Sequence, residues 1–461
     1  MTLRRSRASM SATGKRGGEL HWLWLGLFVV ALTFLGGSSW SDPVHHLLLR
    51  PIAALMLIPV LSGLQQEDIR RGRVGFLLLG SFLFWALLQL VPLPPSVWQM
   101  LPGRQHIAEL DKLSGLDGVW RPVSLAPFRG ANAAFAIVVP FVALLLALAT
   151  RIRSRTLLIG VLAMGILDAV LVQLQVIGGT DSPFYLFPNP SPGAAEGIFA
   201  NENHSAVFSA IVLLIITRLA LDAEGENDPR WLRLCYAPAF LLVLLAVLVS
   251  GSRAGIAAAL LALGASAMMI WWTMPRSGSA DRRSIGRLAG RSGNRVALAG
   301  CAAATILLIV AFVWLERTPA FADIMRSESF DDLRWSLWPI LIEMAATHWL
   351  LGTGFGSFDA VYRSYEPAAL LLPFYVNQAH NDWAQLVIEG GLPAAALLAC
   401  FLGWLAKTVL NLRDGSQPMA GQIIFWVACT AIIGAASLVD YPLRTPIFQA
   451  VCVWLLLCLR V

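Results

Sequence analysis

Residues 317–382 read RTPAFADIMRSESFDDLRWSLWPILIEMAATHWLLGTGFGSFDAVYRSYEPAALLLPFYVNQAHND. This is the longest part of the chain that cannot be embedded in hydrocarbon, and apolar runs fill most of the sequence on both sides of it. Loops longer than about 12–15 residues are usually functional or disordered. The many aromatic and aliphatic side chains argue against disorder here. We therefore expect residues 317–382 to form a folded, partly helical cap between two membrane helices.

The composition of the chain excludes an ordinary soluble protein. Of 461 residues, 57% are hydrophobic and only 13% are charged, whereas roughly a quarter of the residues of soluble domains are charged. At about 20 residues per membrane helix plus connections, the chain has room for about a dozen spans. The composition therefore predicts an all-α polytopic membrane protein. The basic excess, 34 residues against 28 acidic ones, is modest, and we expect no nucleic-acid partner.

Basic loops alternate with apolar runs along the chain. They predict about twelve spans with both ends in the cytoplasm, because short cytoplasmic loops carry an excess of Lys and Arg. A cytoplasmic tail, residues 1–20, precedes nine spans within 21–316, and three more follow the cap within 383–461. The expected spans cover about 22–35, 45–64, 74–94, 130–149, 156–177, 204–221, 234–250, 254–273, 296–315, 383–406, 420–438 and 446–461.

The same alternation places three polar motifs at the outer face of the membrane. They are NENH at 201–204, SGSRAG at 250–255 and DYPLR at 440–444. The cap adds Arg334 and His380 to this face. Polar residues within the spans are few, with Asp168 the main one in the first five, and this disfavours a transport path at the bilayer midplane.

Arginines on the outer face indicate an anion site. An arginine deep in a bilayer costs about 2.5–3.5 kcal/mol, so Arg253 in its short turn needs either an anionic partner or the headgroups. For Arg334, the alternative to binding an anion is a salt bridge with Asp331 or Asp332. Together with Arg444, these forked guanidinium groups suit phosphate oxygens, and a diphosphate is a plausible ligand.

His380 is a candidate general base because histidine titrates near neutrality. The alternative is a purely structural hydrogen bond. Asn381 or Asp382 is positioned to cap the following helix. Gly352-x-Gly354-x-Gly356 has no preceding strand, so we expect a turn and not a nucleotide loop. No acidic cluster offers metal ligands, and we expect neither a metal nor a cofactor.

In these residues the sequence resembles the O-antigen ligase and polymerase superfamily of the Wzy-C type, specifically over about 197–446. The resemblance rests on the SGSRAG turn, Arg334 followed by tryptophans, LGTGFGSF at 351–358, HNDW at 380–383 with EGGL at 389–392, and the DYPLR turn. The NENH segment also matches many members.

The resemblance implies metal-independent, inverting glycosyl transfer on the periplasmic face of the bacterial inner membrane. The donor would be an undecaprenyl-diphosphate-linked glycan. Arg253 and Arg334 would bind the diphosphate, His380 would activate the acceptor hydroxyl, and the further substrate-binding candidates are Arg444, Asn201, His204 and Asn381.

The acceptor stays open at this point. It is growing polysaccharide in a polymerase, lipid A core in a ligase, or protein in an oligosaccharyltransferase, and other polysaccharide-assembly proteins are expected partners. The DYPLR turn resembles exopolysaccharide-associated members. The competing class is a flippase or transporter of lipid-linked glycan without catalytic activity.

Overall fold

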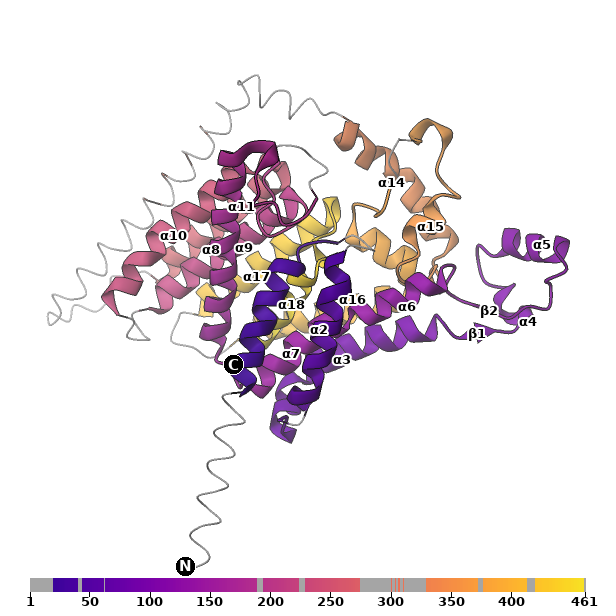
Figure 1. Ribbon diagram of the computed structural model, residues 1–461, viewed down its shortest axis with the longest axis horizontal. Helices are drawn as coiled ribbons and strands as arrows, with labels where there is room; N and C mark the ends of the chain where they lie inside the picture. Colours follow the sequence, from indigo (N-terminus) through magenta and orange to yellow (C-terminus); the bar gives the residue numbers. More distant parts are fainter. Residues whose placement is uncertain are drawn as a thin grey trace, which may run out of the picture. The chain divides into compact units, whose positions relative to one another are not determined.

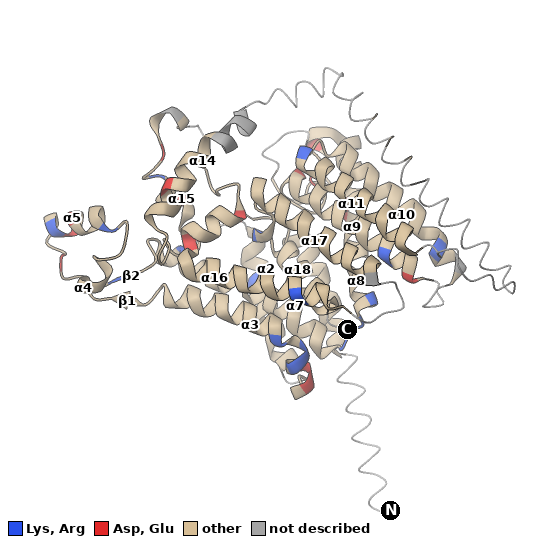
Figure 2. Ribbon diagram, turned by 180° about the vertical axis from the view of Figure 1, so that it is seen from behind, with Lys and Arg blue, Asp and Glu red and all other residues tan. Residues whose placement is uncertain are grey.

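The computed structural model describes residues 20–39, 44–61, 63–188, 194–223, 229–273, 329–371, 376–412 and 419–459, with single helical positions between 300 and 310. These residues are almost entirely helical. The one sheet among them is an antiparallel pair in which β1 (Pro92–Leu93) lies beside β2 (Arg121–Pro122). Figure 2 shows charged positions confined to a few segments of the ribbon, in keeping with the low charge content.

The chain forms two compact units. The first consists of Met1–Ser154, Ser329–Trp404 and Ser437–Val461, and the second of Arg155–Glu328 and Leu405–Ala436. The helices that lie mainly in the first unit are α2 (Val44–Leu61), α3 (Gln66–Leu88), α4 (Pro95–Trp98), α5 (Gln105–Leu113), α6 (Pro127–Ala136), α7 (Val138–Ala149), α14 (Ser329–Thr347), α15 (Phe358–Tyr362), η2 (Ala368–Leu370), α16 (Asp382–Leu410), η3 (Pro442–Arg444) and α18 (Pro446–Cys458). Those of the second unit are α8 (Ser154–Gly178), η1 (Gly179–Asp181), α9 (Glu202–Asp222), α10 (Arg230–Val249), α11 (Arg253–Thr273) and most of α17 (Met419–Val439).

Each unit is built around one helix that is apolar on all sides. In the first unit α7 is buried along nearly its whole length and packs against α2, α3 and α18. In the second unit, 83% of the most apolar 18-residue stretch of α9 is buried, and the helix packs against α10 and α11. A helix that is hydrophobic all round belongs in the interior of a bundle, so the sequence of these two segments explains their central positions.

Nine helical stretches among the described residues are long and apolar enough to cross a membrane. They coincide with the predicted spans two to eight, ten and eleven. The first and last predicted spans correspond to shorter apolar helices, Leu20–Leu35 and Pro446–Cys458. Of the predicted span at 296–315 only residues 300, 303, 306 and 310 are described, and residues 274–299 before them lie outside the described part of the chain. A multi-pass membrane protein is therefore confirmed, while the count of twelve stays a prediction.

The described part of residues 317–382 is folded around its own hydrophobic core. The buried face of α14 contacts α15 and the start of α16, and Figure 1 shows α14 and α15 next to each other in orange. The core residues are Leu337, Ile340, Leu341, Met344, Phe358, Val361, Tyr362, Val376, Ala379 and Ile388. Burying each large side chain contributes about 1.5–3 kcal/mol, so this cluster fixes α14 and α15 on the N-terminal end of α16.

Candidate functional site

His380 stands immediately before α16, with its side chain 15% exposed. It is one of two non-glycine residues with positive φ in the described backbone, at 49°. Its Nδ1 lies 3.7 Å from Oδ1 of Asp440, and its ring meets that of Tyr441 edge-on with 4.9 Å between centroids. A carboxylate beside Nδ1 favours a proton on that nitrogen and leaves Nε2 as the basic atom. The left-handed backbone costs about 1–3 kcal/mol, and such strain clusters at functional sites.

Asn381 caps α16. Its Oδ1 accepts a hydrogen bond from the backbone N–H of Ala384 at 2.9 Å, and its Nδ2 donates to the carbonyl of Leu438 at 2.9 Å. The capping role predicted for Asn381 or Asp382 is therefore confirmed for Asn381. Because both ends of the amide bond to the backbone, the side chain holds His380 against the end of α17.

Arg444 lies between two buried carboxylates of α16. Its Nε is 3.3 Å from Oδ1 of Asp382, and its terminal nitrogen is 3.4 Å from Oε2 of Glu389. The guanidinium is 23% exposed, whereas Asp382 is 6% and Glu389 is 1% exposed. Asp382 also accepts hydrogen bonds from Ser437 Oγ and the backbone N–H of Leu443, each at 3.1 Å. The charge of Arg444 is thus already matched within the protein.

Glu389 joins this ion cluster to the cap. Its Oε1 accepts a hydrogen bond from the backbone N–H of Phe358 and from Gln385 Nε2, both at 3.1 Å. Gln385 in turn donates to Gln378 Oε1 at 2.7 Å and accepts from the backbone N–H of Ala379 at 3.0 Å. The polar side chains of the first two turns of α16 therefore hold the segment that carries His380.

The glycine-rich segment 352–356 is a turn, as predicted. Gly352, Gly354 and Gly356 have φ values of 76°, 95° and 75°, which favour glycine. Helix α16 is interrupted at Gly391 (φ 62°, ψ −159°), and the turn meets the carbonyls near this break: the N–H groups of residues 353 and 354 donate to Ile388 and Glu389 at 2.9 Å. The turn thus satisfies backbone groups that an unbroken helix would use itself.

The second unit brings two of the predicted motifs together. Asn201 is the N-cap of α9, and its Oδ1 accepts from the N–H of Asn203 at 2.8 Å. Ser252 Oγ donates to Oδ1 of Asn203 at 2.6 Å and accepts from the N–H of Gly255 at 2.9 Å. The start of α9 is therefore joined to the start of α11, where Arg253 is the first helical residue and is exposed.

The remaining predicted residues have the following positions. His204 is 1% exposed and meets the ring of Phe199 edge-on. Arg334 belongs to α14, and its side chain lies outside the described part of the structure, so neither its predicted anion role nor the alternative salt bridge is tested. His380, Asn381 and Arg444 share one cluster in the first unit. Arg253, Asn201 and His204 belong to the second unit.

Two acidic groups lie beside α9, and sequence reasoning noted only one of them, Asp168. Asp168 of α8 is completely buried and accepts hydrogen bonds from the N–H of Ile198 and from Ser205 and Ser209. Glu196 is 1% exposed, and its two carboxylate oxygens have no hydrogen-bond partner among the residues that the structure describes. Burial, and secondarily the charge of Glu202, raises the pKa of Glu196 to about 8. The sequence signal for Asp168 was its isolation in an apolar run, whereas nothing marked Glu196.

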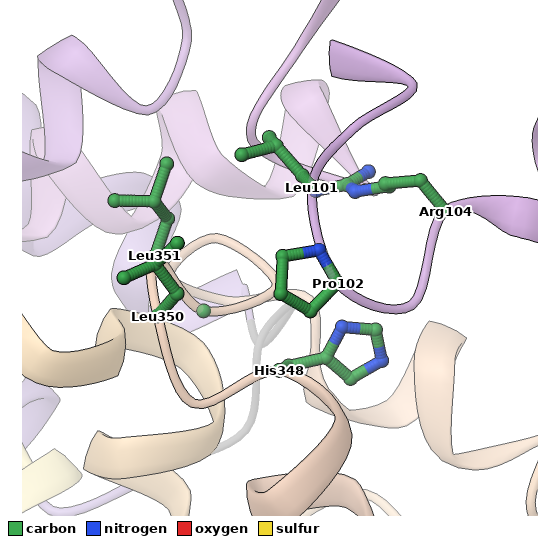
Figure 3. Close-up of a pocket in the computed structure, with 7 residues that line it drawn as sticks. Leu101, Pro102, Arg104, His348, Leu350 and Leu351 are labelled. Atoms are coloured by element: carbon green, nitrogen blue, oxygen red, sulfur yellow. The ribbon is translucent and has the colours of Figure 1, made fainter. Parts of the chain in front are cut away.

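A small cavity lies where the loop after α4 meets the end of α14. Figure 3 shows Pro102 between Arg104 and His348. Leu350 and Leu351 belong to the segment that follows α14. Burial, followed by the charge of Arg104, lowers the pKa of His348 to about 4. Its Nε2 is 3.1 Å from the hydroxyl of Tyr365. This neutral histidine joins the end of α14 to Tyr365 within the cap and lies beside the loop after α4, an arrangement that no motif indicated.

One comparison with known proteins gives a match. Residues 238–399 match the family model Wzy_C, described as O-antigen ligase. No curated protein is significantly similar to the chain. The matched segment contains Arg253, Arg334, His380 and Asn381, whereas Asn201, His204 and Arg444 lie outside it. The resemblance inferred from the sequence is thereby confirmed over residues 238–399, which are similar to the O-antigen ligase family.

Proposed function

We propose that this protein is a membrane glycosyltransferase that moves an undecaprenyl-diphosphate-linked saccharide onto an acceptor hydroxyl at the periplasmic face of the inner membrane. The observation that carries the proposal is the strained, half-buried His380 with the Asp440 carboxylate at its Nδ1. The O-antigen ligase match over residues 238–399 supports the reaction class. Both growing polysaccharide and lipid A core are acceptors that this chemistry serves.

In the proposed reaction His380 Nε2 takes the proton of the acceptor hydroxyl as its oxygen attacks the anomeric carbon of the donor. The new glycosidic C–O bond forms while the bond from that carbon to the diphosphate oxygen breaks. The diphosphate leaves with the bonding electron pair, and the configuration at the anomeric carbon is inverted. Asp440 is a positioning residue, because its carboxylate stabilises the imidazolium that forms at His380.

The arginines have different proposed parts in this reaction. Arg253 and Arg334 bind the diphosphate and stabilise the negative charge that it gains as it leaves. Arg444 has its charge balanced by Asp382 and Glu389, so it has the smaller share in substrate binding. Asn381 contributes by holding the backbone of His380. Asn201 holds Asn203, which accepts the hydrogen bond of Ser252 beside Arg253. His204 packs edge-on against Phe199 at the start of the same helix, α9.

The buried Asp168 gives no support to the competing transport function. Its two oxygens are occupied by Ser205, Ser209 and the backbone N–H of Ile198. A polar residue on a transport path faces a water-filled cavity or a substrate. Asp168 therefore serves to fix the loop before α9.

The test is transfer by the purified protein in liposomes that contain lipid-linked donor and an acceptor saccharide. We expect His380→Ala to bind donor normally but to form new glycosidic bonds about 10²–10⁴-fold more slowly, as is typical after loss of a general base. His106→Ala is the matched control, because His106 is 96% exposed on α5. Wild-type protein that moves donor across the bilayer without changing its glycan would refute the enzymatic assignment.

A second measurement separates the role of Asp440 from simple folding. Asp440→Asn should leave the KM for donor unchanged and lower kcat, because the imidazolium that forms at His380 then loses the carboxylate that stabilises it. An unchanged kcat, at a normal protein level, would remove Asp440 from the mechanism.

A further inference from the structure

Arg104, the residue just before α5, is a buried cation without a matching anion among the described residues. It is 3% exposed. One terminal nitrogen donates a hydrogen bond to the carbonyl of Val123, whereas the buried Nε has no hydrogen-bond partner in the described part of the chain. Burial lowers the pKa of Arg104 to about 10, and no neighbouring charge contributes to this shift. A nearby carboxylate would raise the pKa of an arginine, so none of the described carboxylates compensates this charge.

A buried charge of this kind calls for a partner. Moving an ion out of water costs free energy that an opposite charge or several hydrogen bonds must offset. Nearly all buried polar atoms in proteins have a partner, and an apparent exception often marks a bound water or ion. Arg444 shows the ordinary arrangement: it is 23% exposed, and it pairs with Asp382 and Glu389. Arg104 is more deeply buried and lacks such a pair among the described residues.

The side chain of Arg104 lines the small cavity that Figure 3 shows. The other walls come from Leu101 and Pro102 of the same loop, and from His348 and residues 350–352 at the end of α14 and after it. The volume of the cavity is ≈ 10 Å³, which is about the space that one water-sized particle needs. Pockets for organic ligands measure about 300–1,000 Å³. A sugar or a phosphate group is therefore too large, and a water molecule or a single-atom ion fits.

The charge of the walls decides between these two occupants. The pKa of His348 is lowered to about 4 by burial and by the charge of Arg104, so its imidazole is neutral near pH 7. Arg104 is then the one charged group among the seven residues that line the cavity. A water molecule accepts a hydrogen bond from Nε but leaves the positive charge unmatched. A halide ion accepts the same hydrogen bond and also neutralises the guanidinium.

The cavity lies where three parts of the first unit meet. Gly103 has a φ of 75°, and a Cβ there would lie 2.3 Å from Cε1 of His348, so the loop after α4 is in close contact with the ring. The N–H of Gly352 donates to the carbonyl of His348 at 2.9 Å. A Cβ on Gly352 would lie 2.3 Å from the carbonyl oxygen of Glu389 in α16. An ion in the cavity would therefore strengthen the contact between the loop, the cap and α16.

We propose that the cavity beside Arg104 binds one chloride or similar monatomic anion, which neutralises the buried guanidinium and holds the loop after α4 against the end of α14. The site shares no residue with the cluster of His380, Asp440 and Arg444. The inference is independent of the proposed glycosyl transfer, because it depends only on the burial of Arg104 and the size of the cavity.

Thermal unfolding of the full-length protein in detergent tests the proposal. Chloride is replaced by gluconate, an anion too large for the cavity, at constant ionic strength. We expect the Tm of the wild type to rise by about 2–4 °C with saturation as chloride is added, and bromide to have the same effect. Arg104→Met should show no difference between chloride and gluconate. Arg363→Met is the control that keeps the chloride effect, because Arg363 is 59% exposed and pairs with Asp359. Equal Tm values of the wild type in the two salts would overturn the proposal and leave the cavity to water.

A direct measurement needs no variant. Crystals of the wild-type protein are soaked in bromide and measured at the bromine absorption edge. We expect an anomalous difference peak beside the guanidinium of Arg104. A map with bromide peaks elsewhere on the protein but none at Arg104 would refute the site. A peak at Arg104 without a halide-dependent Tm would mean binding at crystal concentration only, and would refute the stabilising role.

Discussion

Replacement of Arg444 by methionine tests whether this residue is first of all a structural partner of α16. Methionine keeps an unbranched chain and removes the charge, so Asp382 and Glu389 lose their shared cation. Removing one partner of a buried ion pair costs about 3–5 kcal/mol, because an uncompensated charge stays behind. The guanidinium is 23% exposed, so water screens part of the interaction, and we expect a loss of about 2–3 kcal/mol.

A second substitution isolates the pair. In Arg444→Met/Glu389→Gln the amide oxygen can still accept from Phe358 and Gln385, as Oε1 of Glu389 does now. We expect the double variant to regain part of the lost stability, with a coupling energy within about 0.5–3 kcal/mol. Arg363→Met is the control, because Arg363 pairs with Asp359 at 3.9 Å but is 59% exposed. Such surface pairs contribute about 0–1 kcal/mol.

The assay is denaturant unfolding of the purified protein in detergent, alongside glycosyl transfer in liposomes. The argument that the cluster is stabilising would be refuted if the free energy of unfolding of Arg444→Met lay within about 0.5 kcal/mol of the wild-type value, which is the usual range of surface substitutions. Recovery of stability without recovery of transfer would show that Arg444 also contacts substrate. Recovery of both would make its role purely structural.

Two further substitutions test the environment of buried groups. The pKa of Glu196 is raised from 4.5 to about 8 in the folded state. Between these pH values the folded protein keeps the proton of Glu196 and the unfolded chain loses it. Folding is therefore disfavoured by up to about 1.4 kcal/mol for each pH unit of rise. Glu196→Gln should therefore raise the Tm increasingly from pH 5 to pH 8, and a constant offset between the two Tm curves would contradict the burial argument. Gly391→Ala should prevent a stable fold, because its φ of 62° with ψ of −159° suits glycine alone and a Cβ would lie 2.6 Å from the nitrogen of Gly352. Gly403→Ala in the same helix is the control, because a Cβ there would meet no atom within 4 Å. In size-exclusion chromatography we expect Gly403→Ala to keep the monodisperse peak that Gly391→Ala loses.

Local patterns predicted the helices well. A membrane span requires only about 20 apolar residues in succession, which is a property of one segment and needs no knowledge of its neighbours. The glycines at 352, 354 and 356 likewise indicated a turn, because their conformational freedom is local. The side of the membrane on which each loop lies stays a prediction from the positive-inside bias.

Contacts between residues far apart in the chain could be predicted from the sequence only in part. The sequence grouped Asn203 and Arg253 on one face by counting spans, and the hydrogen bond from Ser252 to Asn203 brings their helix starts together. The same counting grouped His380 with Arg444, which share a cluster with Asp440 and Asp382. Counting spans gives the end of the bundle on which a residue lies, but it gives no distances.

The sequence by itself therefore determined the class of protein, most helix positions and the residues that carry the family resemblance, because hydropathy and short motifs are local properties. Only the tertiary structure decided that Asp440 faces His380, that Arg444 is neutralised by Asp382 and Glu389, and that Glu196 is buried. These facts depend on the rotation and register of helices far apart in the chain, and packing sets both only when all the helices are assembled.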